Sequence, residues 1–297
     1  MGNASFQEIL LRAWKVSYGY PVLWAFGLFV AVAATAENML PARAIDLSSF
    51  DKFLASVTDE PRTVLFLFFL SVALFAVSVF GKSNLIVALS LLSDKKKTDK
   101  TFHCRSVRGN FFRAFRLELT VIGFLITVLI ILSFPSLLAY WYNTDVLPLI
   151  FSWSLLTLVP IVFIAFIVRE FALFYFLLSP LRLFSAFENA GAILSRHFIR
   201  CVIFCLSFLG LLLIFTFCLN LAMLSISALF PSSNQMFLGK TMLAFFVNLI
   251  SLTWWNVLQQ AFWLFFFKDL ALPKQLEKTS TEEEAPAQEK IPELPPA

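Results

Sequence analysis

The stretch IVREFALFYFLLSP, residues 167–180, places two adjacent charges inside a long apolar run. The run holds about thirty residues, which is more than the ~20 that a helix needs to cross the hydrocarbon core of a bilayer. A charged side chain inside such a run is costly in hydrocarbon. Arg169 and Glu170 therefore either have a function within the membrane or lie at its surface.

The composition of the whole chain is that of a membrane protein. Of its 297 residues, 59% are hydrophobic, 16% aromatic and only 14% charged, whereas soluble domains average about 25% charged residues. A water-soluble fold would have no interior large enough for this much apolar surface. We predict an all-α polytopic membrane protein, because a helix satisfies its own backbone hydrogen bonds in lipid.

Six apolar segments are long enough to span the bilayer as helices. Prolines separate several of them: Pro41, Pro61, Pro148 and Pro231. Residues 1–272 form the predicted transmembrane domain, and its crossings run approximately over 21–40, 62–81, 117–140, 148–168, 201–224 and 241–263.

Two other segments have distinct patterns. Residues 46–61, DLSSFDKFLASVTDEP, carry apolar side chains at helical spacing and are predicted to form a short helix on the outer membrane surface. Residues 273–297 form an acidic, Pro-rich tail with little apolar surface to bury, and this cytoplasmic tail is predicted to be disordered.

The distribution of Lys and Arg predicts the orientation. The connection after the second crossing carries a basic run: Lys95, Lys96, Lys97, Lys100, Arg105 and Arg108. The predicted outer side holds few cations: Arg43, Lys52, Arg62 and Lys240. We therefore place both termini and the basic run in the cytoplasm. The run acts as a topology signal, as a binding surface for anionic lipid headgroups, or as both.

An internal repeat relates three parts of the chain. Near the end of each even-numbered crossing, a polar position is followed by further apolar residues. These polar positions recur roughly every 90 residues, and they are Lys82, Arg169 with Glu170, and Gln259 with Gln260. We interpret the chain as three units, each an interfacial helix followed by a spanning hairpin. If the units pack around a pseudo-threefold axis, these polar side chains converge.

The repeat leaves two interpretations of Arg169 and Glu170. About 21 residues at 1.5 Å each separate them from Pro148, which brings them to the inner boundary of the bilayer. The pair is then either a hinge between a spanning helix and a surface helix, or a charged site that binds a lipid headgroup or ligand in a cavity facing the cytoplasm.

Other polar residues indicate a role in helix packing and not in catalysis or metal binding. Asn220, Asn248 and Asn256 lie in the last two crossings, where amides typically hydrogen-bond between helices. The cysteines and the two histidines form no set with metal-ligand spacing, and no catalytic motif is found. We therefore predict no metal, no cofactor, no catalytic residues and no nucleic-acid binding.

The segment FQEILLRAWKVSYGYPVLWAFGLFVA, residues 6–31, resembles a group of prokaryotic six-helix membrane proteins. This group includes uncharacterised families and the membrane domain attached to some glycerophosphoryl diester phosphodiesterases. The residues that carry the resemblance are Ala13, Trp14, Pro21, Leu23, Trp24, Phe26, Gly27, Leu28 and Phe29. By hydropathy it extends over about residues 5–270. It implies a six-helix bundle in a prokaryotic cytoplasmic membrane. The phosphodiesterase activity is not carried over, because no soluble segment is long enough for that domain.

Three functions follow from these patterns. The first is a non-enzymatic membrane protein that binds lipid or a protein partner and helps to organise the cell envelope. The second is a transporter or channel component with a path between the hairpin units. The third is a lipid-modifying membrane enzyme. A closed, Phe-packed bundle would favour the first, and a continuous hydrated cavity the second.

Overall fold

A computed structural model describes residues 5–39, 61–93, 104–142, 147–229 and 237–271. These residues form eight helices and no strand, as the all-helical prediction requires. The helices are α1 (Phe6–Gly19), α2 (Val22–Met39), α5 (Pro61–Ser93), α6 (Cys104–Trp141), α7 (Leu147–Leu178), α8 (Leu183–Arg196), α9 (Phe198–Leu229) and α10 (Phe237–Ala271).

Five of these helices, α5, α6, α7, α9 and α10, are long and apolar enough to cross a membrane. A sixth candidate is the pair α1 and α2, which is bent by 98° at the break between the two helices. The multi-pass character predicted from composition is thus confirmed. The predicted outer surface helix (46–61) lies outside the described residues up to Pro61, where α5 begins. The tail (273–297) and Lys95, Lys96, Lys97 and Lys100 also lie outside the described residues.

Local sequence signals explain both ends of α1. Ser5 caps its start: Ser5 Oγ accepts a hydrogen bond from the Glu8 N–H, and the Glu8 carboxylate accepts one from the Ser5 N–H, each at 3.3 Å. Pro21 disfavours a helical conformation at the preceding Tyr20, so α1 ends there and α2 begins. The Trp24 indole N–H, in α2, donates to the Ser17 carbonyl at 2.8 Å and fixes the corner.

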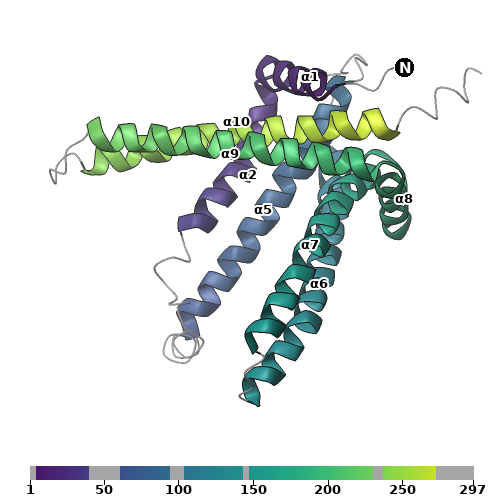
Figure 1. Ribbon diagram of the computed structural model, residues 1–297. Helices are drawn as coiled ribbons and strands as arrows, with labels where there is room; N and C mark the ends of the chain where they lie inside the picture. Colours follow the sequence, from purple (N-terminus) through teal and green to yellow (C-terminus); the bar gives the residue numbers. More distant parts are fainter. Residues whose placement is uncertain (1–4, 40–60, 94–103, 143–146, 230–236, 272–297) are drawn as a thin grey trace, which may run out of the picture.

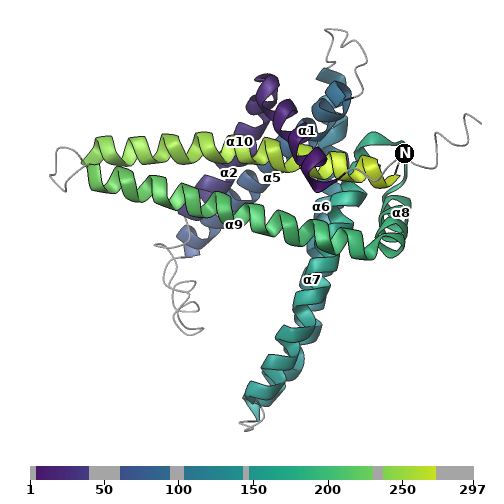
Figure 2. The same cartoon turned by 45° about the horizontal axis from the view of Figure 1, so that its top comes forward.

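The long helices pack in pairs that diverge from one shared region (Figure 1). α2 contacts α5, α6 contacts α7, and α9 contacts α10. In both views the α9–α10 pair leaves this region in a different direction from the α6–α7 pair (Figure 2). α5, α7 and α10 also contact one another across the pairs.

We call the shared region the hub. Its buried cluster is built from the C-terminal parts of α5, α7 and α10 and the N-terminal parts of α6 and α9, with residues of α1, α2 and α8 around them. Many of its side chains are aromatic, and Trp263, Phe171, Phe174 and Phe262 are fully buried. Away from the hub, apolar side chains such as Ile131 and Leu156 are exposed, as lipid contact requires of a membrane helix.

Two sequence expectations about helix ends are corrected. α7 continues unbroken through Arg169 and Glu170 to Leu178, so this pair is not a hinge between two helices. The second expected interfacial helix, before the 117–140 crossing, is instead the first part of the continuous helix α6. Both continuations occur because these segments pack into the hub, where helical backbone is buried among other helices. α1 and α8 are separate short helices, as the repeat predicted.

Candidate functional site

Four charged side chains from three helices meet in the hub. They are Lys82 of α5, Glu118 of α6, and Arg169 and Glu170 of α7; together we call them the ion-pair cluster. α6 and α7 lie side by side in both views, and α5 contacts both of them (Figure 1). The cluster therefore joins the α2–α5 pair to the α6–α7 pair.

Arg169 binds Glu118 with two parallel hydrogen bonds. Arg169 Nε lies 2.6 Å from Glu118 Oε2, and Arg169 Nη2 lies 2.7 Å from Glu118 Oε1. This side-on geometry is the strong form of an arginine–carboxylate pair, because two charge-assisted hydrogen bonds share one orientation. Arg169 Nη1 also donates to Glu170 Oε1 at 3.3 Å.

Lys82 of the α2–α5 pair completes the ion-pair cluster. Its Nζ donates to Glu170 Oε1 at 2.6 Å and lies 3.9 Å from Glu118 Oε1. Each cation thus faces both carboxylates, and the two positive and two negative charges balance. This balance matters because an unpaired charge in a low-dielectric interior costs several kcal/mol.

The carboxylates lie deeper than the cations. The side chains of Glu118 and Glu170 are 4% and 1% exposed, whereas that of Arg169 is 27% exposed. The Arg169 side chain is therefore partly exposed, while its guanidinium is bound to both carboxylates.

Aromatic side chains surround the charges on the α10 side. The Trp263 ring packs edge-on against Phe166 and Phe171 of α7, with centroids 5.7 and 6.1 Å apart. Phe204 of α9 stacks on Phe266 of α10 at 3.6 Å. These contacts bury α10 against α7 and α9, and they make this side of the hub a closed, aromatic core.

Three further polar contacts tie the helix ends around the hub. Arg200 at the start of α9 pairs with Asp269 near the end of α10 at 3.0 Å. Lys268 of α10 donates to Ser93 at the end of α5. Arg113 of α6 donates to the Ser179 carbonyl at 2.8 Å, beyond the end of α7, where Pro180 stops the helix. The second contact joins the α9–α10 pair to the α2–α5 pair, and the other two each hold the ends of one pair together.

The structure brings together only some of the residues singled out from sequence. Lys82, Arg169 and Glu170 lie within ion-pair distance of one another. Gln260 is buried in α10 and Gln259 is half-buried beside it. Within the described residues, no hydrogen bond joins either glutamine to the four charges.

The other singled-out residues lie elsewhere. Asn220 is exposed on α9, and Asn248 and Asn256 are half-buried on α10. The described part of the chain shows no hydrogen bond from these amides to another helix, so their role as interhelical contacts stays a prediction. Arg105 and Arg108 lie in the first turns of α6.

Sequence reasoning missed Glu118 as a partner of Arg169. A charge in an apolar helix needs a partner one helical turn away or on another helix. The positions four residues before and after Glu118 are Ala114 and Ile122, neither of which can pair with it. The lack of a cation one helical turn from Glu118 was therefore the sequence signal that Glu118 pairs with a residue of another helix.

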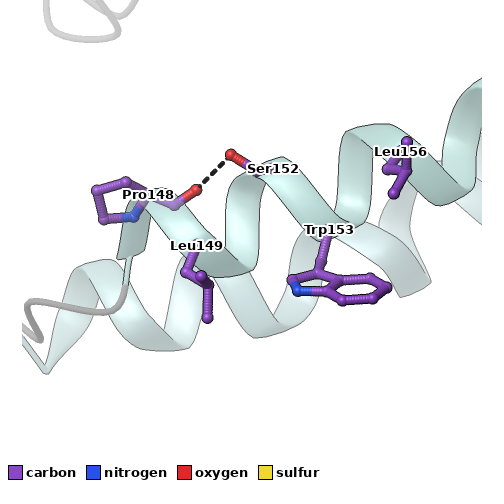
Figure 3. A pocket seen from close by; sticks show the side chains of 5 residues that line it. All are labelled: Pro148, Leu149, Ser152, Trp153 and Leu156. Atoms are coloured by element: carbon purple, nitrogen blue, oxygen red, sulfur yellow. Dashed lines mark hydrogen bonds between the residues drawn. The ribbon is translucent and has the colours of Figure 1, made fainter.

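A pocket at the opposite end of α7 is of a different kind (Figure 3). Pro148, Leu149, Ser152, Trp153 and Leu156 line it, and the Ser152 hydroxyl donates to the Pro148 carbonyl at 2.7 Å. Leu149, Trp153 and Leu156 are each more than half exposed. With its one hydroxyl already bonded, this surface hollow suits an acyl chain and offers no reactive group.

Among the described residues, no group of three or more His, Cys, Asp or Glu side chains could hold a metal ion.

Comparisons of the chain with models of protein families, with curated proteins and with solved structures gave no match.

Proposed function

We propose that this chain is a non-enzymatic integral membrane protein that binds anionic lipid at the hub end and helps to organise the envelope of a prokaryotic cell. One observation carries the proposal: exposed cations and exposed aromatic side chains lie together on two amphipathic helices, α1 and α8, beside a closed core. This combination is typical of helices that lie in the headgroup region of a bilayer.

The exposed face of α1 carries this pattern in detail. Ile9, Ala13 and Ser17 are buried, and α1 contacts α10. Leu11, Trp14 and Tyr18 lie on the other side of the helix and are at least half exposed. Arg12 and Lys15 are exposed beside them, so their charges can reach phosphates while the apolar side chains enter the acyl boundary.

α8 repeats the arrangement. Phe184 is 80% exposed in its first turn. Arg182, just before the helix, and Arg196 in its last turn are exposed as well. Two surface helices with the same chemistry at one end of the molecule favour a membrane surface over a single protein partner, which would need one contiguous patch.

The same charges support six crossings in three hairpin units with both termini in the cytoplasm. At the hub end the exposed cations include Arg12, Lys15, Arg116, Arg182 and Arg196. At the far ends of the described helix pairs the cations are Arg62 and Lys240. Cytoplasmic sides of membrane proteins carry the excess of Lys and Arg, so the hub faces the cytoplasm in this proposal.

Cysteine accessibility tests this orientation. In a background in which all four native cysteines are replaced by alanine, Arg62→Cys is expected to react with a membrane-impermeant maleimide in intact cells. Arg182→Cys is expected to react only after the membrane is opened, because it lies at the hub end. The reverse pattern would place the hub outside the cell and contradict the proposed topology.

Lipid binding is tested by native mass spectrometry from nanodiscs that contain phosphatidylglycerol and phosphatidylcholine. Each near-surface charge contributes about 1 kcal/mol to binding anionic lipid, so Arg182→Gln with Arg196→Gln is expected to weaken phosphatidylglycerol retention roughly 30-fold. Arg62→Gln, an equally exposed arginine at the far end, serves as the matched control and should leave retention unchanged. Equal retention by all three proteins would rule out headgroup binding at α8.

Transport of a small molecule is the second candidate. The observation that favours it is a group of buried polar atoms without hydrogen-bond partners in the hub: one each on Asn84, Glu170, Gln260 and Trp263. The observation that weighs against it is that the charges of the ion-pair cluster are bound to one another. A coupling ion or a charged substrate would have to break those pairs.

A further inference from the structure

Four buried polar atoms in the hub lack a hydrogen-bond partner among the described residues. They are Asn84 Oδ1, Glu170 Oε2, Gln260 Oε1 and Trp263 Nε1. Asn84 and Trp263 are fully buried, and Glu170 and Gln260 are only 1% and 6% exposed. In native proteins the large majority of buried side-chain polar atoms are hydrogen-bonded, so four such atoms in one region require an explanation.

The four atoms lie on three helices that contact one another, α5, α7 and α10. The ion pair between Lys82 and Glu170 places Lys82 of α5 beside Glu170, while Asn84, two residues further along the helix, points to another face of α5. The Trp263 ring packs against Phe166 and Phe171, which flank Glu170 on α7.

Gln260 completes the set on α10. It precedes Trp263 by three residues and so lies about one helical turn away on the same side of the helix. Gln260 and Trp263 thus share one side of α10, and Trp263 packs against the part of α7 that holds Glu170.

The chemistry of the four atoms selects the kind of molecule that can satisfy them. Three are acceptors, and the Trp263 N–H is a donor only. A bare metal cation would satisfy the oxygens but would be repelled by the indole N–H. It would also add a charge to a cluster whose two cations and two carboxylates already balance. A neutral molecule with both donors and acceptors meets both requirements.

We infer that the hub is a buried hydrated site for a small neutral hydrogen-bonding molecule, with water as its simplest occupant. Such a water accepts from Trp263 Nε1 and donates to acceptors such as Glu170 Oε2 and Gln260 Oε1. Buried waters typically make about three hydrogen bonds of this kind. The site is distinct from the proposed lipid-binding surface of α1 and α8, and its test does not measure lipid binding.

Radiolytic footprinting tests the inference in the full-length protein in nanodiscs. Brief X-ray exposure converts water next to a side chain into hydroxyl radicals, which oxidise that side chain, and mass spectrometry measures the rate. Trp255 is the internal control, because it is also a buried tryptophan of α10 and also packs against Phe208, but it lies about two helical turns from Trp263. Repeating the exposure in ¹⁸O-labelled water identifies the source of the oxygen.

Trp263 is expected to be oxidised several-fold faster than Trp255, although Trp263 is 0% exposed and Trp255 is 5% exposed. Gln260→Leu removes one of the acceptors and is expected to lower the Trp263 rate several-fold. Gln259→Leu, the matched change at the half-buried neighbour, should leave it unchanged. A Trp263 rate at or below that of Trp255 in the unaltered protein would overturn the inference, whether or not the variants fold.

Discussion

Glu118→Gln is expected to remove a large part of the stability of the folded protein. The change keeps the shape of the side chain but removes its negative charge, and the amide can accept only one of the two Arg169 hydrogen bonds made at 2.6 and 2.7 Å. Removing one partner of a buried ion pair typically costs about 3–5 kcal/mol, out of about 5–15 kcal/mol for a whole domain. The loss is measured by thermal unfolding in nanodiscs and by the yield of monodisperse protein after detergent extraction.

Two further variants identify the cause of that loss. Glu188→Gln neutralises an exposed glutamate of α8 and should be nearly neutral, because an exposed charge is solvated by water. Glu118→Gln combined with Arg169→Gln removes both charges and should recover much of the stability, since the pair of Lys82 with Glu170 remains. If Glu118→Gln unfolds at the same temperature as Glu188→Gln, the ion-pair cluster does not stabilise the hub.

Much of the fold could be predicted from hydropathy because lipid restricts the choices. A spanning segment must be helical, so an apolar run such as 148–168 predicts a helix by itself. The prediction located this crossing inside α7, but α7 runs to Leu178. The extra length lies in the hub, where helices are held by neighbouring helices and hydropathy carries no boundary signal.

The candidate site was only partly predictable, for a related reason. The unusual positions of Lys82, Arg169 and Glu170 were visible, because charge in an apolar run is conspicuous. The repeat also predicted that Lys82 would converge with Arg169 and Glu170, but not that Glu118 would join them, because hydrogen bonds between Arg169 and Glu118 depend on the packing of α6 against α7. Spacing along one helix says which side chains share a face, but it says nothing of which helix lies opposite.

The close approach of α2 to its neighbours depends on two glycines that the sequence pattern did not single out as contacts. A Cβ atom at position 27 would lie 2.7 Å from Val257 Cγ2 and 2.8 Å from the Thr253 carbonyl oxygen of α10. A Cβ atom at position 81 would lie 2.8 Å from the Phe26 carbonyl oxygen of α2. The first glycine thus lets α2 approach α10, and the second lets α5 approach α2, as small residues do in membrane helices.

Gly27→Ala is therefore expected to destabilise the protein by about 1–3 kcal/mol, the usual cost of overpacking a tight interior. The added methyl group meets a backbone oxygen, which cannot move without shifting the whole of α10. Gly81→Ala should act in the same direction. The measurement is the thermal unfolding temperature in nanodiscs, followed together with the yield of folded protein.

Gly210→Ala supplies the matched control, because Gly210 lies inside α9 and a Cβ atom there would meet nothing within 4 Å. With no clash, alanine gains only its helix propensity over glycine, up to about 1 kcal/mol, so this variant should be neutral or more stable. If the same change from glycine to alanine lowers the stability at position 27 and raises it at position 210, the difference arises from packing alone. If Gly27→Ala instead gains stability as Gly210→Ala does, α2 and α10 do not meet at this crossing, and the hub must be assembled in another way.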